Sequence, residues 1–252
     1  MNNTKKKSPI SWVPTAYFAM GLPFVVLNMV TVLMFKGLEV DDKLITFWTS
    51  LILLPWTLKP LWSPFLELFR TKKFFVIVTQ LITGVTFGLV AFALNLSHFF
   101  SISIALLAIV AFSGATHDIA CDGVYMSELS NEDQAKFIGW QGAFYNIAKI
   151  LATGGLVYLA GYFIELNADA GLLTANKRAW MIILLILSVT MILLGIYHLF
   201  ALPSTQSASS KKTLRSNKEV MKELGQVLMD LFRKTHITYY ICFIVLCRYA
   251  EG

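Results

Sequence analysis

The sequence predicts an all-α membrane protein that crosses the bilayer repeatedly, with six complete transmembrane helices and the start of a seventh. The 252-residue chain is 56% hydrophobic and 14% charged, whereas soluble domains carry roughly 25% charged residues. Its mean hydropathy is +0.65. The apolar residues form blocks of about 20, the length that spans a bilayer as a helix. The lysines and arginines gather in alternate connecting segments, as in multi-pass membrane proteins.

Each expected span is a long apolar segment bounded by polar loops. The second segment holds Pro55, Pro60 and Pro64, so its second half cannot form a straight helix. The third carries Gly84 and Gly88 four residues apart, a spacing that lets another helix approach closely. The expected boundaries of the six spans are 12–35, 44–66, 74–94, 100–126, 137–163 and 178–202.

The chain divides into three parts on this reading. Residues 1–202 form an N-terminal six-helix transmembrane bundle, and residues 203–235 form a cytoplasmic linker. The linker contains a basic segment with apolar residues at helical spacing, which predicts an amphipathic helix on the membrane surface. Residues 236–252 begin a seventh span. Because a helix cut there would end in hydrocarbon, we expect the natural protein to be longer.

Lysine and arginine placement predicts a cytoplasmic N-terminus. The expected inner segments hold Lys5, Lys6, Lys7, Arg70, Lys72, Lys73, Lys136 and the cluster at 211–234. The expected outer loops hold only Lys36, Lys43, Lys177 and Arg178. The same asymmetry accounts for the net charge of +6 without a nucleic-acid partner.

The cysteines do not indicate a metal or disulfide framework. Cys121, Cys242 and Cys247 all fall in predicted spans, and none forms a metal-ligand pattern with histidine. We therefore expect buried thiols, and neither a metal nor a cofactor.

Two carboxylates inside the fourth span are the strongest functional signal. Asp118 and Asp122 are four residues apart, so a helix places both on one face, with Gly114 one turn earlier. Carboxylates within a hydrophobic span are costly and usually face a bundle interior or a wet cavity. This stripe therefore predicts the working face of a transporter. His117 points about a quarter turn away, and we expect a hydrogen-bonded packing residue there.

The role of each buried charge has a structural and a functional interpretation. Asp118 lies within reach of Lys149 in the antiparallel fifth span, so the pair either fixes helix packing or exchanges protons and partners during transport. Asp122 lies near the cytoplasmic boundary, where a structural role is equally plausible. Arg248 and Glu251, three residues apart in the seventh span, either neutralise each other or serve an anionic substrate and the fourth-span carboxylates.

Other polar side chains mark a possible substrate path. Gln141, Tyr145 and Lys149 recur at four-residue steps on one face of the fifth span. In the first span, Asn28 lies three residues before Thr31, so the two could share a face. Interhelical hydrogen bonding is the alternative role for both. Pro14 and Pro23 predict a local kink in the same span.

Three stretches resemble one branch of a known superfamily. Residues 58–64 (LKPLWSP), 115–123 (ATHDIACDG) and 246–252 (LCRYAEG) are similar to AmpG-like muropeptide permeases and acetyl-CoA transporters of the major facilitator superfamily. In that branch the fourth-span segment has Gln where this chain has His117 and Ala where it has Gly123. The turn after the second span also resembles the superfamily's gating motif. Its members here are Lys59, Glu67, Arg70, Lys72 and Lys73.

The resemblance implies a fold of two six-helix halves around a site near the middle of the membrane. It also implies secondary active transport, coupled to protons, by a monomer in the inner (plasma) membrane. The implied cargo is an anhydro-muropeptide or another bulky sugar-peptide. The alternative cargo is acetyl-CoA or another organic anion, which Lys149 and Arg248 would suit.

Two other classes of function compete with transport. Asp118 and Asp122 lie on one helix, whereas intramembrane aspartyl proteases bring two aspartates from different helices, so we expect no catalytic residues. A non-transporting membrane half-domain is the second rival.

Overall fold

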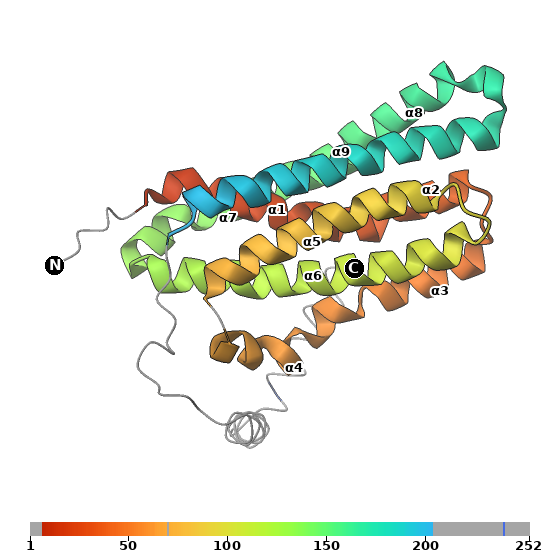
Figure 1. Cartoon of the computed structure of the whole chain (residues 1–252). Helices are drawn as coiled ribbons and strands as arrows, with labels where there is room; N and C mark the ends of the chain where they lie inside the picture. Colours follow the sequence, from red (N-terminus) through yellow and green to blue (C-terminus); the bar gives the residue numbers. More distant parts are fainter. Residues whose placement is uncertain (1–6, 70, 204–238, 240–252) are drawn as a thin grey trace.

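The computed structural model describes residues 7–69, 71–203 and 239, and all regular structure within them is helical. Six helical segments are long and apolar enough to cross a membrane, which confirms the predicted all-α bundle (Figure 1). The predicted linker and seventh span lie outside the described residues, except for Pro203 and Tyr239. Also outside them are Arg70, Cys242, Cys247, Arg248 and Glu251.

The first span is one continuous helix with a change of winding in its middle. It consists of α1 (Pro9–Val25), a π-helical turn at Val26–Val30 and α2 (Thr31–Gly37). Pro23 lies inside α1 and lacks the N–H that would bond to the Ala19 carbonyl, whereas the π-turn follows it. The π-helical turn that carries Asn28 begins three residues after Pro23, and the kink expected at the prolines stays a prediction.

The second span breaks as its prolines predict. α3 (Asp42–Ile52) starts after Asp41, whose carboxylate accepts hydrogen bonds from the backbone N–H groups of Lys43 and Leu44. The helix ends before Leu53, and α4 (Leu54–Phe69) begins in a new direction. The break directly precedes Pro55. As a result, α4 crosses beside the C-terminal half of α6 rather than continuing the line of α3 (Figure 1).

The third, fourth and sixth spans form the most regular part of the bundle. They are α5 (Lys72–Ala93), α6 (Phe99–Glu128) and α9 (Leu172–Ala201). A Cβ at Gly84 would lie 2.7 Å from Ile192 Cγ1 and 2.9 Å from the Ser188 carbonyl oxygen, both on α9. A Cβ at Gly88 would lie 3.1 Å from Ser188 Oγ. The two glycines therefore permit the close helix contact that their spacing predicted.

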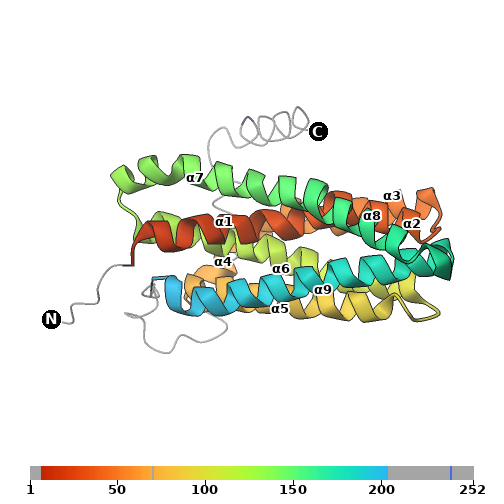
Figure 2. The same cartoon turned by 90° about the horizontal axis from the view of Figure 1, so that it is seen from above.

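The fifth span lies along the outside of the bundle, beside α1 (Figure 2). It comprises α7 (Asn131–Ile150), a π-helical turn at Leu151–Leu156 and α8 (Val157–Leu166), followed by a short 3₁₀ turn at Ala168–Ala170. Only 22% of its most apolar 18-residue stretch is buried, the same share as in the second span, whereas 67% of the corresponding stretch is buried in the first span. These two spans are therefore the least enclosed parts of the described bundle.

A polar layer separates two apolar cores. The larger core surrounds Phe87, Leu107 and Trp180, and the smaller one surrounds Trp12 and Val124. Between them, α5 and α6 bury a run of polar side chains. These are Thr79, Gln80, Thr83, Thr86, Ser113, Thr116, His117 and Asp118. Because buried polar groups in an apolar bundle are costly, this layer is where function is expected to reside.

Candidate functional site

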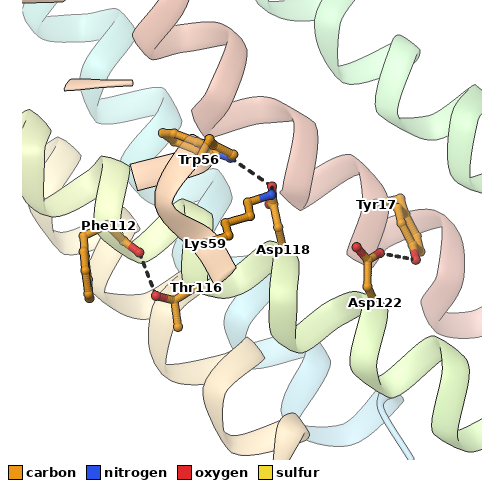
Figure 3. Close-up of polar contacts among 7 residues, drawn as sticks. All are labelled: Tyr17, Trp56, Lys59, Phe112, Thr116, Asp118 and Asp122. Carbon is orange, nitrogen blue, oxygen red and sulfur yellow. Dashed lines mark hydrogen bonds and ion pairs between the residues drawn. The ribbon is translucent and has the colours of Figure 1, made fainter. Parts of the chain in front are cut away.

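Asp118 on α6 is the centre of the candidate site. Its side chain is buried, with 7% of the residue exposed. The Oδ2 atom accepts hydrogen bonds from Lys59 Nζ at 2.6 Å and from Trp56 Nε1 at 2.9 Å. Both donors come from consecutive turns of α4 and reach the carboxylate together (Figure 3). The helix that the prolines redirect thus carries the cation and the indole to Asp118.

The second oxygen of this carboxylate is uncommitted. Asp118 Oδ1 is buried and has no hydrogen-bond partner within the described part of the chain. Buried carboxylate oxygens are nearly always hydrogen-bonded, so an orphan of this kind calls for an explanation. An oxygen in this position can take a proton or a donor from a bound molecule without breaking the contacts of Oδ2.

The partner expected for Asp118 from the sequence, Lys149, is not the one found. Lys149 is exposed, and no ion pair of its ammonium occurs among the described residues. The reason lies in the packing of α7 on α1, where Gly21 admits the backbone of Tyr145 and the Cβ of Ala148. That contact directs Lys149, the next residue, away from α6. Lys59, expected only at the gate, makes the ion pair instead.

Asp122, one turn further along α6, belongs to a second polar chain. It is exposed in the described bundle, and its Oδ1 accepts a hydrogen bond from the Tyr17 hydroxyl at 2.8 Å (Figure 3). Tyr17 OH in turn accepts a hydrogen bond from Gln141 Nε2 at 2.8 Å. This chain links α6 to α1 and α7. The sequence singled out Asp122 and Gln141 but missed Tyr17, which shares a helical stripe with Gly21 and Asn28.

The remaining path residues are placed apart from this centre. Tyr145 is half-buried against Gly21. Asn28 is exposed within the π-turn, whereas Thr31 is buried and donates to the Leu27 carbonyl at 2.7 Å. The expectation that Asn28 and Thr31 share a face is therefore wrong, because the π-turn changes the angular spacing between them.

Of the gating residues, the structure places the side chains of Lys59, Lys72 and Lys73. Lys73 Nζ donates to the Leu202 carbonyl at 2.8 Å, which ties the start of α5 to the end of α9. The Lys72 stem lies over Gly123, where a Cβ would come within 2.7 Å of Lys72 Cδ. Glu67 belongs to α4. Lys59 and Lys72 therefore adjoin the Asp118–Asp122 stripe rather than a separate site.

His117 behaves as the sequence predicted, as a buried hydrogen-bonded residue. Its Nε2 lies 2.9 Å from Gln80 Nε2 on α5. The sequence did not identify Gln80 or the further residues that continue this contact. Cys121 is a free, buried thiol. No group of three or more His, Cys, Asp or Glu side chains suited to a metal occurs in the described ranges.

Comparison with known protein families places almost the whole chain in one of them. Residues 20–250 match the BT1 family. No curated protein and no solved structure matches the chain. The matched region contains all the spans but the first turns of α1, together with the Asp118–Lys59 pair. The chain belongs to the BT1 family, a family of membrane transporters within the major facilitator superfamily that includes AmpG-like permeases and acetyl-CoA transporters.

Proposed function

We propose that this protein is a proton-coupled secondary active transporter that takes up anhydro-muropeptide-like sugar-peptides across an inner membrane. Membership of a transporter family supports the transport part of the proposal. The observation that carries the coupling part is the state of Asp118, a buried carboxylate with one oxygen held by Lys59 and Trp56 and the other free.

The coupling step follows from the charge of that carboxylate. While Asp118 is ionised, its attraction for Lys59 holds α4 against α6, and the effect is strong because water is largely excluded. A proton added to Oδ1 removes the negative charge and with it most of this attraction. Lys59 then becomes available to water or to an anionic group of the cargo, and α4 is free to move. Proton uptake and helix movement are thereby linked through one ion pair.

Asp122 supplies a second link of the same kind. Its carboxylate holds Tyr17, which is also held by Gln141 of α7. The two least enclosed spans are thus each attached to the bundle through hydrogen bonds that lead to a carboxylate of α6. We infer that protonation or substrate contact at the two aspartates releases α4 and α7 in different steps of the cycle.

The orientation and organisation proposed are those that the basic residues indicate. The N-terminus faces the cytoplasm, the first 202 residues act as one six-helix half, and residues 203–235 connect it to a second half that begins at 236. Arg248 and Glu251 of that second half act together with the buried charges of the first half. The whole transporter works as a monomer in lipid. The cargo assignment rests on the resemblance of the 115–123 segment to muropeptide permeases.

A second cargo is favoured by one specific observation. Lys149 is exposed within a membrane-spanning helix, and a cation in such a position usually faces a partner or an aqueous pathway. An organic anion such as acetyl-CoA would suit Lys149 and Lys59 together. A half-domain without transport activity is the remaining alternative.

The experiment that tests the proposal is uptake of labelled anhydro-muropeptide into cells that carry the full-length gene. Wild type is compared with Asp118→Asn and with Asp169→Asn, an exposed carboxylate outside the site, at matched membrane expression and with or without an uncoupler. We expect uncoupler-sensitive uptake that Asp118→Asn abolishes and Asp169→Asn retains.

Each other outcome removes a defined part of the proposal. Uncoupler-sensitive uptake that survives Asp118→Asn removes Asp118 from coupling. Absence of uptake by inserted wild type contradicts the sugar-peptide assignment, and the same assay with acetyl-CoA then tests the organic-anion alternative. Failure of both cargoes removes both assignments and leaves another organic anion or the non-transporting half-domain.

A further inference from the structure

A second polar cluster crosses the bundle beside Asp118, and neither the coupling carboxylates nor the gate uses it. His117 on α6 contacts Gln80 on α5, with 2.9 Å between their Nε2 atoms. Gln80 Oε1 lies 2.9 Å from His198 Nδ1 on α9, and His198 Nε2 lies 2.9 Å from Thr15 Oγ1 on α1. Gln80 and His198 are completely buried, and His117 is 3% exposed. One hydrogen-bonded chain thus joins four helices.

The donors and acceptors of these side chains determine the direction of each hydrogen bond between them. If Gln80 Nε2 faces His117, the proton of a neutral His117 ring must be on Nδ1, an atom that is buried and has no partner among the described residues. Turning the amide by 180° lets His117 Nε2–H donate to Gln80 Oε1 and lets the Gln80 amide donate to His198 Nδ1. Such amide turns are assigned from the hydrogen-bond network.

The turned arrangement places one donor and one acceptor at each of the three contacts between these side chains. His198 Nε2–H then donates to the Thr15 hydroxyl, which donates to the Trp12 carbonyl at 3.2 Å. His117 Nδ1 is left as a bare acceptor, which costs less than an orphaned N–H. The hydrogen bonds therefore run in one direction, from His117 through Gln80 and His198 to Thr15, between uncharged side chains, and they resist rotation of α6 relative to α5.

The position of His117 connects this chain to the candidate site. His117 directly precedes Asp118, and successive residues of an α-helix differ by about 100° in direction. His117 therefore faces α5 while Asp118 faces α4. On that side, Gly114 admits Trp56 so closely that a Cβ would lie 2.8 Å from Trp56 Cζ2. A small rotation of α6 would disturb both this contact and the bond from Trp56 to Asp118.

We propose that Gln80, His117 and His198 are positioning residues for Asp118. By fixing the rotation of α6, they hold the carboxylate in register with Lys59 and Trp56. The consequence for transport rests on the proposed function, but the positioning itself is measurable without any cargo. An apolar replacement of a buried polar cluster is often neutral for stability, so stability alone does not distinguish this role from packing.

The test measures the reactivity of Asp118 with a hydrophobic carbodiimide, which modifies protonated carboxyl groups. Membranes containing the full-length protein are labelled at one fixed pH, and peptide mass spectrometry gives the rates at Asp118 and Asp122 in the same sample. Gln80→Met removes the bridging amide at similar length. The charged groups that face Asp118, Lys59 from α4 and Asp122 from α6, remain in every variant.

We expect Gln80→Met to raise the ratio of labelling at Asp118 to labelling at Asp122 about threefold or more, the scale of one lost hydrogen bond. His198→Met breaks the chain one link further away and gives a smaller rise. His117→Gln keeps a hydrogen-bonding side chain at this position and stays within the wild-type range. The control Ser103→Ala removes a buried hydroxyl on the same helix that has no partner among the described residues, and it leaves the ratio unchanged.

Two results overturn the proposal. A wild-type ratio in inserted Gln80→Met and His198→Met protein would show that the chain does not position Asp118. An equal rise at Asp118 and Asp122 would show general loosening, which is a packing role. Neither result depends on uptake, so a failure here is separate from a failure of the transport experiment.

Discussion

Lys59 of α4 lies 2.6 Å from Asp118 of α6, and this contact joins a poorly enclosed helix to the buried polar layer of the bundle. Asp118 is buried while 28% of the Lys59 side chain is exposed. The lysine can therefore leave the pair for water more easily than the carboxylate can. This asymmetry makes Asp118 the fixed member of the pair and Lys59 the movable one.

The first prediction concerns removal of the movable member. Lys59→Met leaves a buried carboxylate without its cation, so we expect a loss of about 2 kcal/mol in the free energy of unfolding, below the 3–5 kcal/mol of fully buried pairs because the lysine is partly exposed. Asp118→Asn in the same chain should restore part of this loss. Thermal unfolding of the single and double variants in one detergent measures the coupling. Additive effects would contradict a direct interaction.

The second prediction concerns the link between Asp122 and α7. Tyr17→Phe removes the hydroxyl that bonds both Asp122 and Gln141, and we expect a loss of about 1–2 kcal/mol in stability. Gln141→Leu should cost less, and the double variant should resemble Tyr17→Phe alone because both changes break the same chain. A double-mutant cycle by thermal unfolding tests this. A sum of two independent losses would show that Gln141 acts elsewhere.

The third prediction concerns the packing of α5 on α9. Gly84→Ala places a Cβ 2.7 Å from Ile192 Cγ1 and 2.9 Å from a backbone oxygen, which cannot move away easily. We expect destabilisation of about 1–3 kcal/mol, as for other overpacked sites. Gly142→Ala on α7 is the matched control, because no atom lies within 4 Å of its added Cβ. Helix propensity alone should make that control neutral or slightly more stable. Equal stability of the two variants would contradict the close contact.

The sequence predicted the parts of this molecule that depend on local patterns. The six spans follow from apolar length, the break before Pro55 follows from proline chemistry, and the α5–α9 contact follows from the glycine spacing. The choice of Lys59 as the partner of Asp118 was not predictable in this way. It depends on the direction that α4 takes after the break, which is a tertiary property.

Two uncharged polar residues, Tyr17 and Gln80, were the other omission. Both lie within apolar spans, where a single hydroxyl or amide is a weaker indication of function than a charge because it costs less to bury. Their importance becomes visible only through their partners, Asp122 and His117, which the sequence did single out. Charge marked the centre of the site, and three-dimensional contacts were needed to find the residues that support it.

The last prediction concerns the gate next to Asp122. Gly123→Ala, which installs the residue found in the resembling branch, places a Cβ 2.7 Å from Lys72 Cδ. Because a lysine stem is flexible, we expect the side chain to move aside with a stability change within about 0.5 kcal/mol. The displaced ammonium should react faster with an amine-directed reagent, which peptide mass spectrometry quantifies against Lys136 in the same sample. Lys136 is an exposed lysine on α7 whose ion pair with Glu132 lies outside the site.

The control for this experiment is Gly139→Ala, which adds a methyl group in open space near the same end of the bundle. It should leave the ratio of Lys72 to Lys136 labelling unchanged. An unchanged ratio in Gly123→Ala as well would mean that Lys72 does not need the space over Gly123. A higher ratio of Lys72 to Lys136 labelling in Gly123→Ala, together with altered uptake, would mean that the position of Lys72 over Gly123 is part of the gate. The unchanged stability would show that the fold is intact.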